Sequence, residues 1–239
     1  MIEVLINGKW KLKLPESSAK EWLDNMRTHK GIWEGERLDE LNKEIKQGSV
    51  VYYIGAYKGD MAALLETWGA KLVVMEGTAG FWPLIKETWE LNKLKSPVGF
   101  FSGLVSNRTT IQAVKKDLTT WPTRSEPFVE WQTGFAHLAE SAGVFPEVSV
   151  NDFRLITDIV PDIITVDVEG SELEVMKGAK ETLLKYHPTL ILSIHPEFMF
   201  HNHNVYEREL HDLIEESGYD KGKHLAYDHE HHWLYKAKQ

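Results

Sequence analysis

The chain has no cysteine among its 239 residues. It therefore cannot form disulfides, thiolate metal sites or a cysteine nucleophile. Its N-terminal residues lack the apolar core of a signal peptide, and no apolar run approaches the length of a membrane span. We accordingly expect a cytoplasmic protein without a membrane partner.

Positive charge is also scarce, since 27 Lys and Arg residues face 36 Asp and Glu residues, for a net charge of −9. This balance disfavours a nucleic-acid partner, because phosphate binding relies on a basic surface. The contents of hydrophobic (42%) and charged (26%) residues are those of a globular protein. The length suits one large α/β domain, and nothing in the sequence indicates the oligomeric state.

Residues 1–48 predict a short strand pair around Asn7–Gly8 and then polar helical segments, which we interpret as an N-terminal flank or lid. From residue 49 to 239 apolar strands, glycine turns and amphipathic helices alternate, which is typical of βαβ units on a parallel sheet. The predicted parallel strands are Val50–Ile54, Leu72–Met75, Val98–Leu104, Ile163–Val168 and Leu190–Ile194.

Two further segments depart from this alternation. Lys223–Tyr227 and His232–Lys236 predict a hairpin, so the sheet should end with an antiparallel strand. Residues 107–146 contain prolines and show no clear period, which predicts an insertion that could cover a substrate site. Trp121 and Trp131 in this stretch could stack on a sugar ring, although packing in the core or a lid is the expected role.

A glycine turn, Gly55–Asp60, joins the first of these strands to its helix. Small residues at a helix N-terminus let a ligand approach the backbone, although the same residues could serve only a tight turn. Glu76 ends the next strand, roughly twenty residues later, where an acid can accept hydrogen bonds from both hydroxyls of a ribose. A nicotinamide enzyme would need a glycine where Tyr57 stands, which disfavours an oxidoreductase.

The stretch Asp162–Glu172, DIITVDVEGSE, is the most specific motif, and it continues through Glu174, Met176, Lys177, Gly178 and Ala179. It resembles the DvEGxE…LkGa block of the FkbM methyltransferase family. Together with the glycine turn, Glu76 and Ser149–Asp152, the resemblance extends from about Val50 to Glu197. It implies a doubly wound, Rossmann-like class I methyltransferase sheet, S-adenosylmethionine as the methyl donor, and transfer to a hydroxyl oxygen of a small molecule or sugar.

The turn and the resemblance together assign a set of donor-contacting residues: Tyr53, Gly55, Ala56, Tyr57, Gly59, Asp60, Glu76, Ser106 and Asp167. Tyr53 stands where the family usually has an acid, and Tyr57 stands where it usually has asparagine. These two departures leave open a second hypothesis, a non-catalytic binding protein with the methyltransferase fold.

The candidate catalytic residues follow two neighbouring strands. Asp167 and Glu169 are two residues apart at the end of one strand, so they should share a face at the carboxyl edge, and either could be the base. His195 follows the next strand, and imidazole is the usual general base near neutral pH. We expect these three residues to form the acceptor-side cluster, with His195 as the base. In the structural alternative, Asp167 binds the glycine turn and Glu169 caps the following helix.

A metal is the remaining alternative at this edge. Asp167 with His195 or Glu197 could hold Mg²⁺ or another divalent ion, but we favour acid–base chemistry without metal. The other histidine groups, His201 with His203 and His229–His232, lie in polar turn contexts. They predict solvated loop histidines and not metal ligands.

Overall fold

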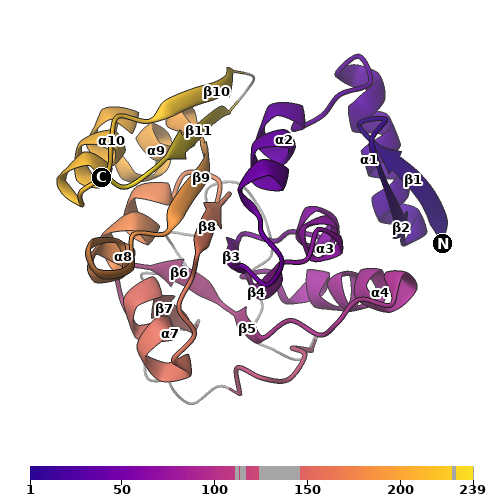
Figure 1. The fold of residues 1–239 in the computed structure, drawn as a ribbon, viewed down its shortest axis with the longest axis horizontal. Helices are drawn as coiled ribbons and strands as arrows, with labels where there is room; N and C mark the ends of the chain where they lie inside the picture. The colour runs from indigo at the N-terminus through magenta and orange to yellow at the C-terminus, as the bar shows by residue number, and fades with distance from the viewer. Residues whose placement is uncertain (111–112, 114–116, 124–145, 228–229, 239) are drawn as a thin grey trace.

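A computed structural model describes residues 1–110, 113, 117–123, 146–227 and 230–238. Its centre is a seven-stranded sheet with the order β10-β11-β9-β8-β3-β4-β5 (Figure 1). The strands are β3 (Val50–Ile54), β4 (Lys71–Glu76), β5 (Gly99–Ser102), β8 (Ile163–Val166), β9 (Thr189–Ile194), β10 (Lys223–Tyr227) and β11 (His231–Tyr235). The five strands from β9 to β5 are parallel.

The strand order confirms the doubly wound α/β sheet predicted from the sequence. The chain runs outward from β3 through β4 to β5 and then returns to the other side of β3 for β8 and β9. Ligands of such sheets bind where the order reverses, at the carboxyl ends of the strands. The C-terminal hairpin is also confirmed, but β11 lies between β9 and β10 and is antiparallel to both. The antiparallel strand is therefore inside the sheet, and the edge strand β10 runs in the direction of β9.

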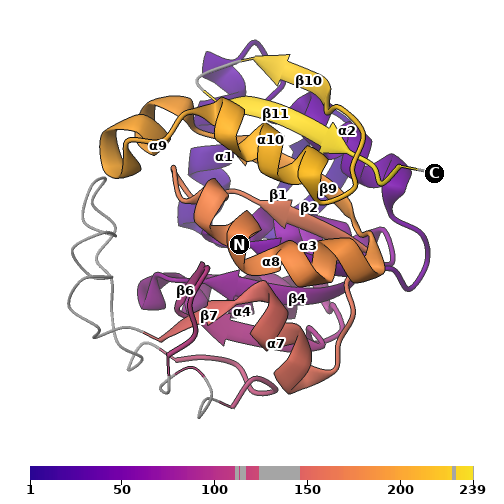
Figure 2. The same ribbon diagram turned by 90° about the vertical axis from the view of Figure 1, so that its left-hand side faces the viewer.

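Helices cover both faces of the sheet, as the alternation along β3 shows. Val51 and Tyr53 pack with the helices α3 (Asp60–Thr67) and α4 (Trp82–Asn92), whereas Tyr52 and Ile54 face the opposite cluster. The opposite cluster involves α7 (Val150–Thr157), α8 (Glu172–Tyr186) and α10 (Glu207–Glu216). Figure 2 shows these three helices in front of the sheet. A strand buried on both faces reads as a continuous apolar run, which explains the composition of β3.

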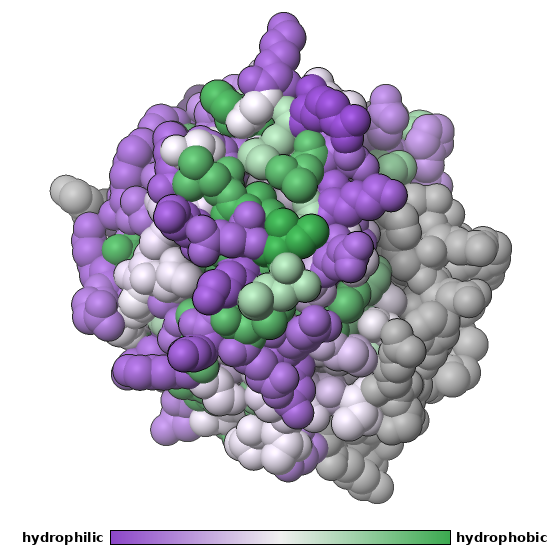
Figure 3. Space-filling view, turned by 90° about the vertical axis from the view of Figure 1, so that its right-hand side faces the viewer, coloured by the Kyte–Doolittle hydropathy of each residue, from purple (hydrophilic) through white to green (hydrophobic). Residues whose placement is uncertain are grey.

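The N-terminal segment packs on the same face as α3 and α4. It consists of β1 (Ile2–Ile6), β2 (Trp10–Leu14), α1 (Glu16–Thr28) and α2 (Gly35–Glu44). Leu12, Trp22 and Leu38 belong to the core cluster that contains Val51 of β3, so the segment shares its core with the sheet. Figure 3 views the side of the molecule on which β1, β2 and α1 lie in Figure 1, and it shows apolar patches among polar ones.

The structure also corrects several boundaries. The predicted strand Val98–Leu104 is interrupted at Gly103, where an added Cβ would lie 2.3 Å from the carbonyl oxygen of Pro146. The chain turns there into β6 (Leu104–Ser106), which pairs with β7 (Glu147–Ser149). A further helix, α9 (Pro196–His203), was not predicted.

Most of the predicted insertion at 107–146, including Trp131, lies outside the described residues. Trp121 is described. The centroid of its ring lies 4.6 Å from that of Phe100 and 5.9 Å from that of Trp89, which supports a role in core packing. Among the described helices, none is long and apolar enough to cross a membrane.

Candidate active site

The glycine turn leaves β3 and touches the end of β8. Gly55 has a φ of +84°, and the N–H groups of Gly55 and Ala56 both donate to the carbonyl oxygen of Met75, at 2.9 and 3.1 Å. A Cβ on Gly55 would lie 1.8 Å from the carbonyl oxygen of Asp167. Only glycine fits this position, because a side chain would clash with backbone that cannot move aside. The turn therefore packs directly against the backbone of Asp167.

Glu76 lies across this turn and is 7% exposed. Its Oε2 accepts the N–H of Tyr57 at 2.7 Å, and its Oε1 accepts the N–H of Thr78 at 2.6 Å. Burial raises the pKa of Glu76 to about 7, although the two backbone hydrogen bonds oppose that rise. A carboxylate oxygen can accept more than one hydrogen bond, so both oxygens retain capacity for an incoming hydroxyl. The carboxylate thus suits the ribose of a donor nucleoside.

Helix α1 contacts the other side of the turn. The hydroxyl of Tyr57 donates to Glu21 at 3.1 Å, and Lys58 forms an ion pair with the same carboxylate. Trp22 donates its indole N–H to Asp60, the first residue of α3, whose other oxygen accepts the N–H of Met61 at 3.0 Å. Burial raises the pKa of Asp60 to about 6. Both oxygens of this predicted donor-contacting residue are therefore engaged within the protein.

Arg37 of α2 contacts residues of β3 and β8 from the N-terminal segment, and its side chain is fully buried. Its Nη2 donates to the hydroxyl of Tyr53 and to Thr165 Oγ1, both at 3.2 Å. Its Nη1 donates to Asp167 at 2.8 Å and to Glu34 at 3.0 Å. Arg37 is not among the predicted site residues, because an arginine in a polar helix is usually solvated. Tyr53, which stands where an acid is expected, is one of the four acceptors of this buried guanidinium.

His195 follows β9 and brings the three predicted catalytic residues together. Its Nε2 lies 3.6 Å from Glu169 and 3.8 Å from Asp167. Two acids that were not predicted lie closer, since Glu172 is 2.8 Å from Nδ1 and Glu230 is 3.1 Å from Nε2. Burial alone would lower the pKa of His195, but the carboxylates raise it to about 12. The imidazole therefore carries a proton on both nitrogens at neutral pH.

Glu169 lies in this cluster, but it is not part of a strand as the two-residue spacing from Asp167 suggests. Strand β8 ends at Val166, and Glu169 has a φ of +54° in the following turn. It does not cap α8, whose N-cap residue is Ser171. Its side chain is 41% exposed, compared with 23% for Asp167, which makes it the more accessible of the two. Burial raises the pKa of Glu169 above its ordinary value, and His195 opposes the rise.

The structure corrects the expectation for the last histidine group. His231 and His232 lie in β11, and His232 is only 4% exposed, whereas His229 is outside the described residues. The alternation along β11 could have predicted the burial of His232, because His232 and Leu234 lie on the same buried face of the strand. Glu230, just before the strand, extends its two oxygens toward His195 and His232. Glu197 is exposed at the start of α9 and is not in this cluster.

Ser106 is engaged elsewhere. It lies on β6, where its hydroxyl donates to Glu147 and accepts the N–H of Arg108 at 3.1 Å. Its role beside the adenine of the donor stays a prediction.

Solved structures with the same architecture define the class of the fold. The ribosomal protein L11 methylase of Lactobacillus delbrueckii subsp. bulgaricus matches with a TM-score of 0.51 and 10% identity, over 86% of this chain and 78% of that one. The precorrin-6y C5,15-methyltransferase of Geobacter metallireducens GS-15 matches with a TM-score of 0.51 and 11% identity, over 87% of this chain and 89% of that one. The fold is that of the class I methyltransferases.

The family follows from the sequence match. The model of the methyltransferase FkbM domain matches residues 54–221, well over half of the chain, so the protein belongs to the FkbM methyltransferase family. Its methyl donor is S-adenosylmethionine. No curated protein has a matching sequence. The predicted block around Asp167 lies within the matched range, whereas Arg37, Glu230 and His232 lie outside it.

Proposed function

We propose that the protein transfers the methyl group of S-adenosylmethionine to a hydroxyl oxygen of a small molecule or saccharide. The observation that carries this proposal is the convergence of Asp167, Glu169 and His195 beside the glycine turn. A hydroxyl acceptor must lose its proton as the methyl group arrives, so a carboxylate-rich edge next to the donor suits an oxygen acceptor.

The donor side supports this arrangement. The bound donor supplies an electrophilic methyl group on its sulfonium. Glu76 would accept hydrogen bonds from the ribose hydroxyls, and the backbone from Gly55 to Gly59 would line the donor. The contact between Gly55 and Asp167 then brings the donor site next to the acids.

Glu169 is the residue we assign as the base. His195 holds a proton on each nitrogen, so it has no lone pair to offer a hydroxyl until it loses one. Glu169 is more exposed than Asp167 and lies 3.6 Å from the imidazolium, which would stabilise its negative charge. Asp167 already accepts a hydrogen bond from Arg37. We therefore assign His195 and Asp167 as residues that position Glu169 and the acceptor. The alternative, in which His195 is the base as predicted from the sequence, is untested, and a comparison of Glu169→Gln with His195→Gln distinguishes the two residues.

The acceptor class is inferred from charge. The net charge of −9 and the acids at this edge would repel a polyanion, which favours a small neutral acceptor over nucleic acid. The two similar structures are named for different acceptors, a ribosomal protein and a precorrin, so the shared fold does not choose among acceptors.

Two measurements test the proposal. Calorimetric titration with S-adenosylmethionine and its demethylated product should show donor binding, and a titration with NADH should show none. Labelled donor should then methylate a member of a panel of saccharides and small alcohols, with the position of the methyl group found by mass spectrometry and NMR. Transfer only to nitrogen or carbon would overturn the oxygen acceptor. An absence of donor binding would favour the non-catalytic hypothesis.

A further inference from the structure

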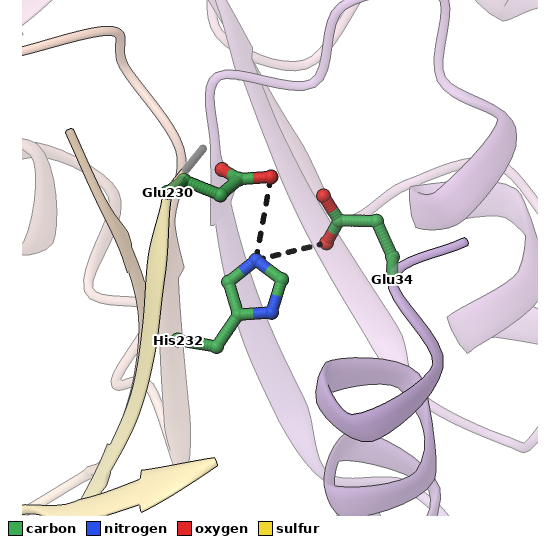
Figure 4. A group of neighbouring side chains, drawn as sticks. All are labelled: Glu34, Glu230 and His232. Atoms are coloured by element: carbon green, nitrogen blue, oxygen red, sulfur yellow. Dashed lines mark ion pairs between the residues drawn. The ribbon is translucent and has the colours of Figure 1, made fainter. Parts of the chain in front are cut away.

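A second group of side chains lies on the N-terminal side of the acid cluster. Glu34 precedes α2, whereas Glu230 precedes β11 and His232 lies in it. Figure 4 shows both carboxylates turned toward one nitrogen of the His232 ring. The three residues are 8%, 4% and 4% exposed, and one ligand atom of each lies within 4.8 Å of the others. They form a buried, mixed nitrogen and oxygen site.

The distances from His232 to the two carboxylates suit ligands of an ion better than hydrogen-bond partners. His232 Nε2 lies 3.5 Å from Glu34 Oε2 and 3.4 Å from Glu230 Oε1. Hydrogen bonds of this kind are usually about 2.7–3.2 Å long. Two ligands of a tetrahedral ion, each about 2.1 Å from it, lie about 3.4 Å apart.

His232 supplies an independent observation. Neither of its ring nitrogens makes a hydrogen bond with a described residue, although both are buried. An unsatisfied polar atom inside a protein is costly, and most such atoms have a partner. The Nε2 atom is aimed between the two carboxylates, so a cation held there would satisfy it.

We propose that Glu34, Glu230 and His232 bind a divalent transition-metal ion such as Zn²⁺ or Mn²⁺. One imidazole and two carboxylates are an ordinary ligand set for these ions. Mg²⁺ is a poorer fit, because it favours oxygen ligands and keeps several of its waters.

The charge around the group supports a cation. One guanidinium, that of Arg37, and the imidazoles of His195 and His232 lie among a larger set of acids. These acids are Glu34, Asp167, Glu169, Glu172 and Glu230. A divalent ion would offset part of this negative charge in a place where water screens little. Arg37 donates to the Glu34 oxygen nearest His232, and a carboxylate oxygen can serve both partners.

The site would connect the two ends of the chain. Glu34 belongs to the N-terminal segment and His232 to the last strand, and both lie outside the region 54–221 that matches the family domain. Glu230 also contacts His195, so the ion would share a ligand residue with the acceptor-side cluster. The ion would therefore hold the N-terminal segment in register with that cluster. This proposal does not depend on the identity of the methyl acceptor.

The test uses the full-length protein after treatment with a chelator. Calorimetric titration with Zn²⁺ and with Mn²⁺ should show one ion per chain, and the melting temperature should rise with either ion. His232→Asn should weaken binding of the ion by more than about 100-fold. The loss of a residue that only hydrogen-bonds to a metal ligand already lowers metal affinity by about 10–100-fold. The matched control is His231→Asn, which alters the neighbouring residue, whose side chain is 25% exposed and contacts Glu207. The control should bind the ion as the wild type does.

Several results would overturn the proposal. The wild-type protein could bind neither ion, or His232→Asn could bind as tightly as the wild type. Binding that is lost in His195→Asn and kept in His232→Asn would place the ion among Asp167, His195 and Glu230 instead. If circular dichroism shows that His232→Asn does not fold, Glu34→Gln takes its place and should show the same loss. Electron paramagnetic resonance of Mn²⁺ in the wild type gives a readout without any variant, because an absence of nitrogen coupling would exclude a histidine ligand.

Discussion

The two sides of the candidate site are built in different ways. The donor side, from Gly55 to Glu76, comes from one continuous β3-α3-β4 unit, and its contacts are mostly backbone hydrogen bonds. The acid and histidine side takes Arg37 from one end of the chain, His195 from the middle of the sheet and Glu230 from the other end. The donor side is therefore a local motif, whereas the acid side depends on the whole fold.

The two sides also differ in how their charges are balanced. Among the residues that the structure describes, no cation forms an ion pair with Glu76, and burial raises its pKa to about 7. On the other side, Arg37 and His195 each contact at least two carboxylates. Removing a cation from that side should therefore cost more than removing the acid from the donor side.

The largest expected effect is on stability. Arg37→Met should lower the free energy of unfolding by ~3–5 kcal/mol, because the buried Glu34 and the partly exposed Asp167 would both lose the guanidinium that pairs with them. Denaturant unfolding followed by circular dichroism measures the change. Arg27→Met is the control, since Arg27 is exposed in its pair with Asp24 and should contribute at most about 1 kcal/mol. Equal losses in the two variants would contradict the role given to Arg37.

The next effect is on the chemical step. Glu169→Gln should lower kcat by ~10²-fold or more, because an amide cannot accept the proton of the hydroxyl, while donor affinity stays near that of the wild type. Single-turnover kinetics with labelled donor and calorimetry separate the two quantities. Glu174→Gln removes a nearby acid that pairs with Lys177, outside the cluster, and should be nearly silent. If Glu169→Gln keeps its activity and His195→Gln loses it, the base is His195.

A smaller effect is expected on the donor side. Glu76→Ala should weaken donor binding by ~1–3 kcal/mol, because the ribose hydroxyls lose a charged acceptor. Calorimetry with the demethylated donor measures it. Glu66→Ala is the matched control. Glu66 also accepts a backbone N–H, that of Lys95, but it lies near the C-terminal end of α3, whereas the glycine turn precedes the N-terminal end. Unchanged affinity in Glu76→Ala would remove Glu76 from the donor site.

The smallest effect concerns pH. The pKa of Glu76 is raised to about 7, and ribose hydroxyls donate better to the ionised form. Donor affinity should therefore fall as the pH drops through 7, and it should be at most about tenfold weaker at pH 6 than at pH 8. Glu76→Gln should bind weakly at both pH values and show no such slope. A slope of the same size in Glu76→Gln would assign the titration to another group.

Local sequence patterns are enough to predict the elements of the donor side. The run of apolar residues in β3, the glycine turn and Glu76 at the end of β4 follow from local periodicity and spacing, and a βαβ unit has few other ways to fold. The same reasoning placed Asp167 and His195 at one edge, because the carboxyl ends of parallel strands meet there. It also predicted the hairpin, but not that β11 enters the sheet beside β9.

The burial and the protonation of the acid side depend on contacts that form in the folded chain. Arg37 is buried because it pairs with Glu34 and with Asp167, which is distant in sequence. The pattern of its own helix does not indicate the contact with Asp167. His195 follows its strand as predicted. Its two ring nitrogens, however, pair with Glu172 of α8 and with Glu230, which precedes β11. His232 lies in a histidine-rich stretch whose sequence is polar, but the pairing of β11 with β9 places its side chain in the interior. Burial and pKa depend on everything that surrounds a side chain, so neighbours from distant segments set them and local sequence does not.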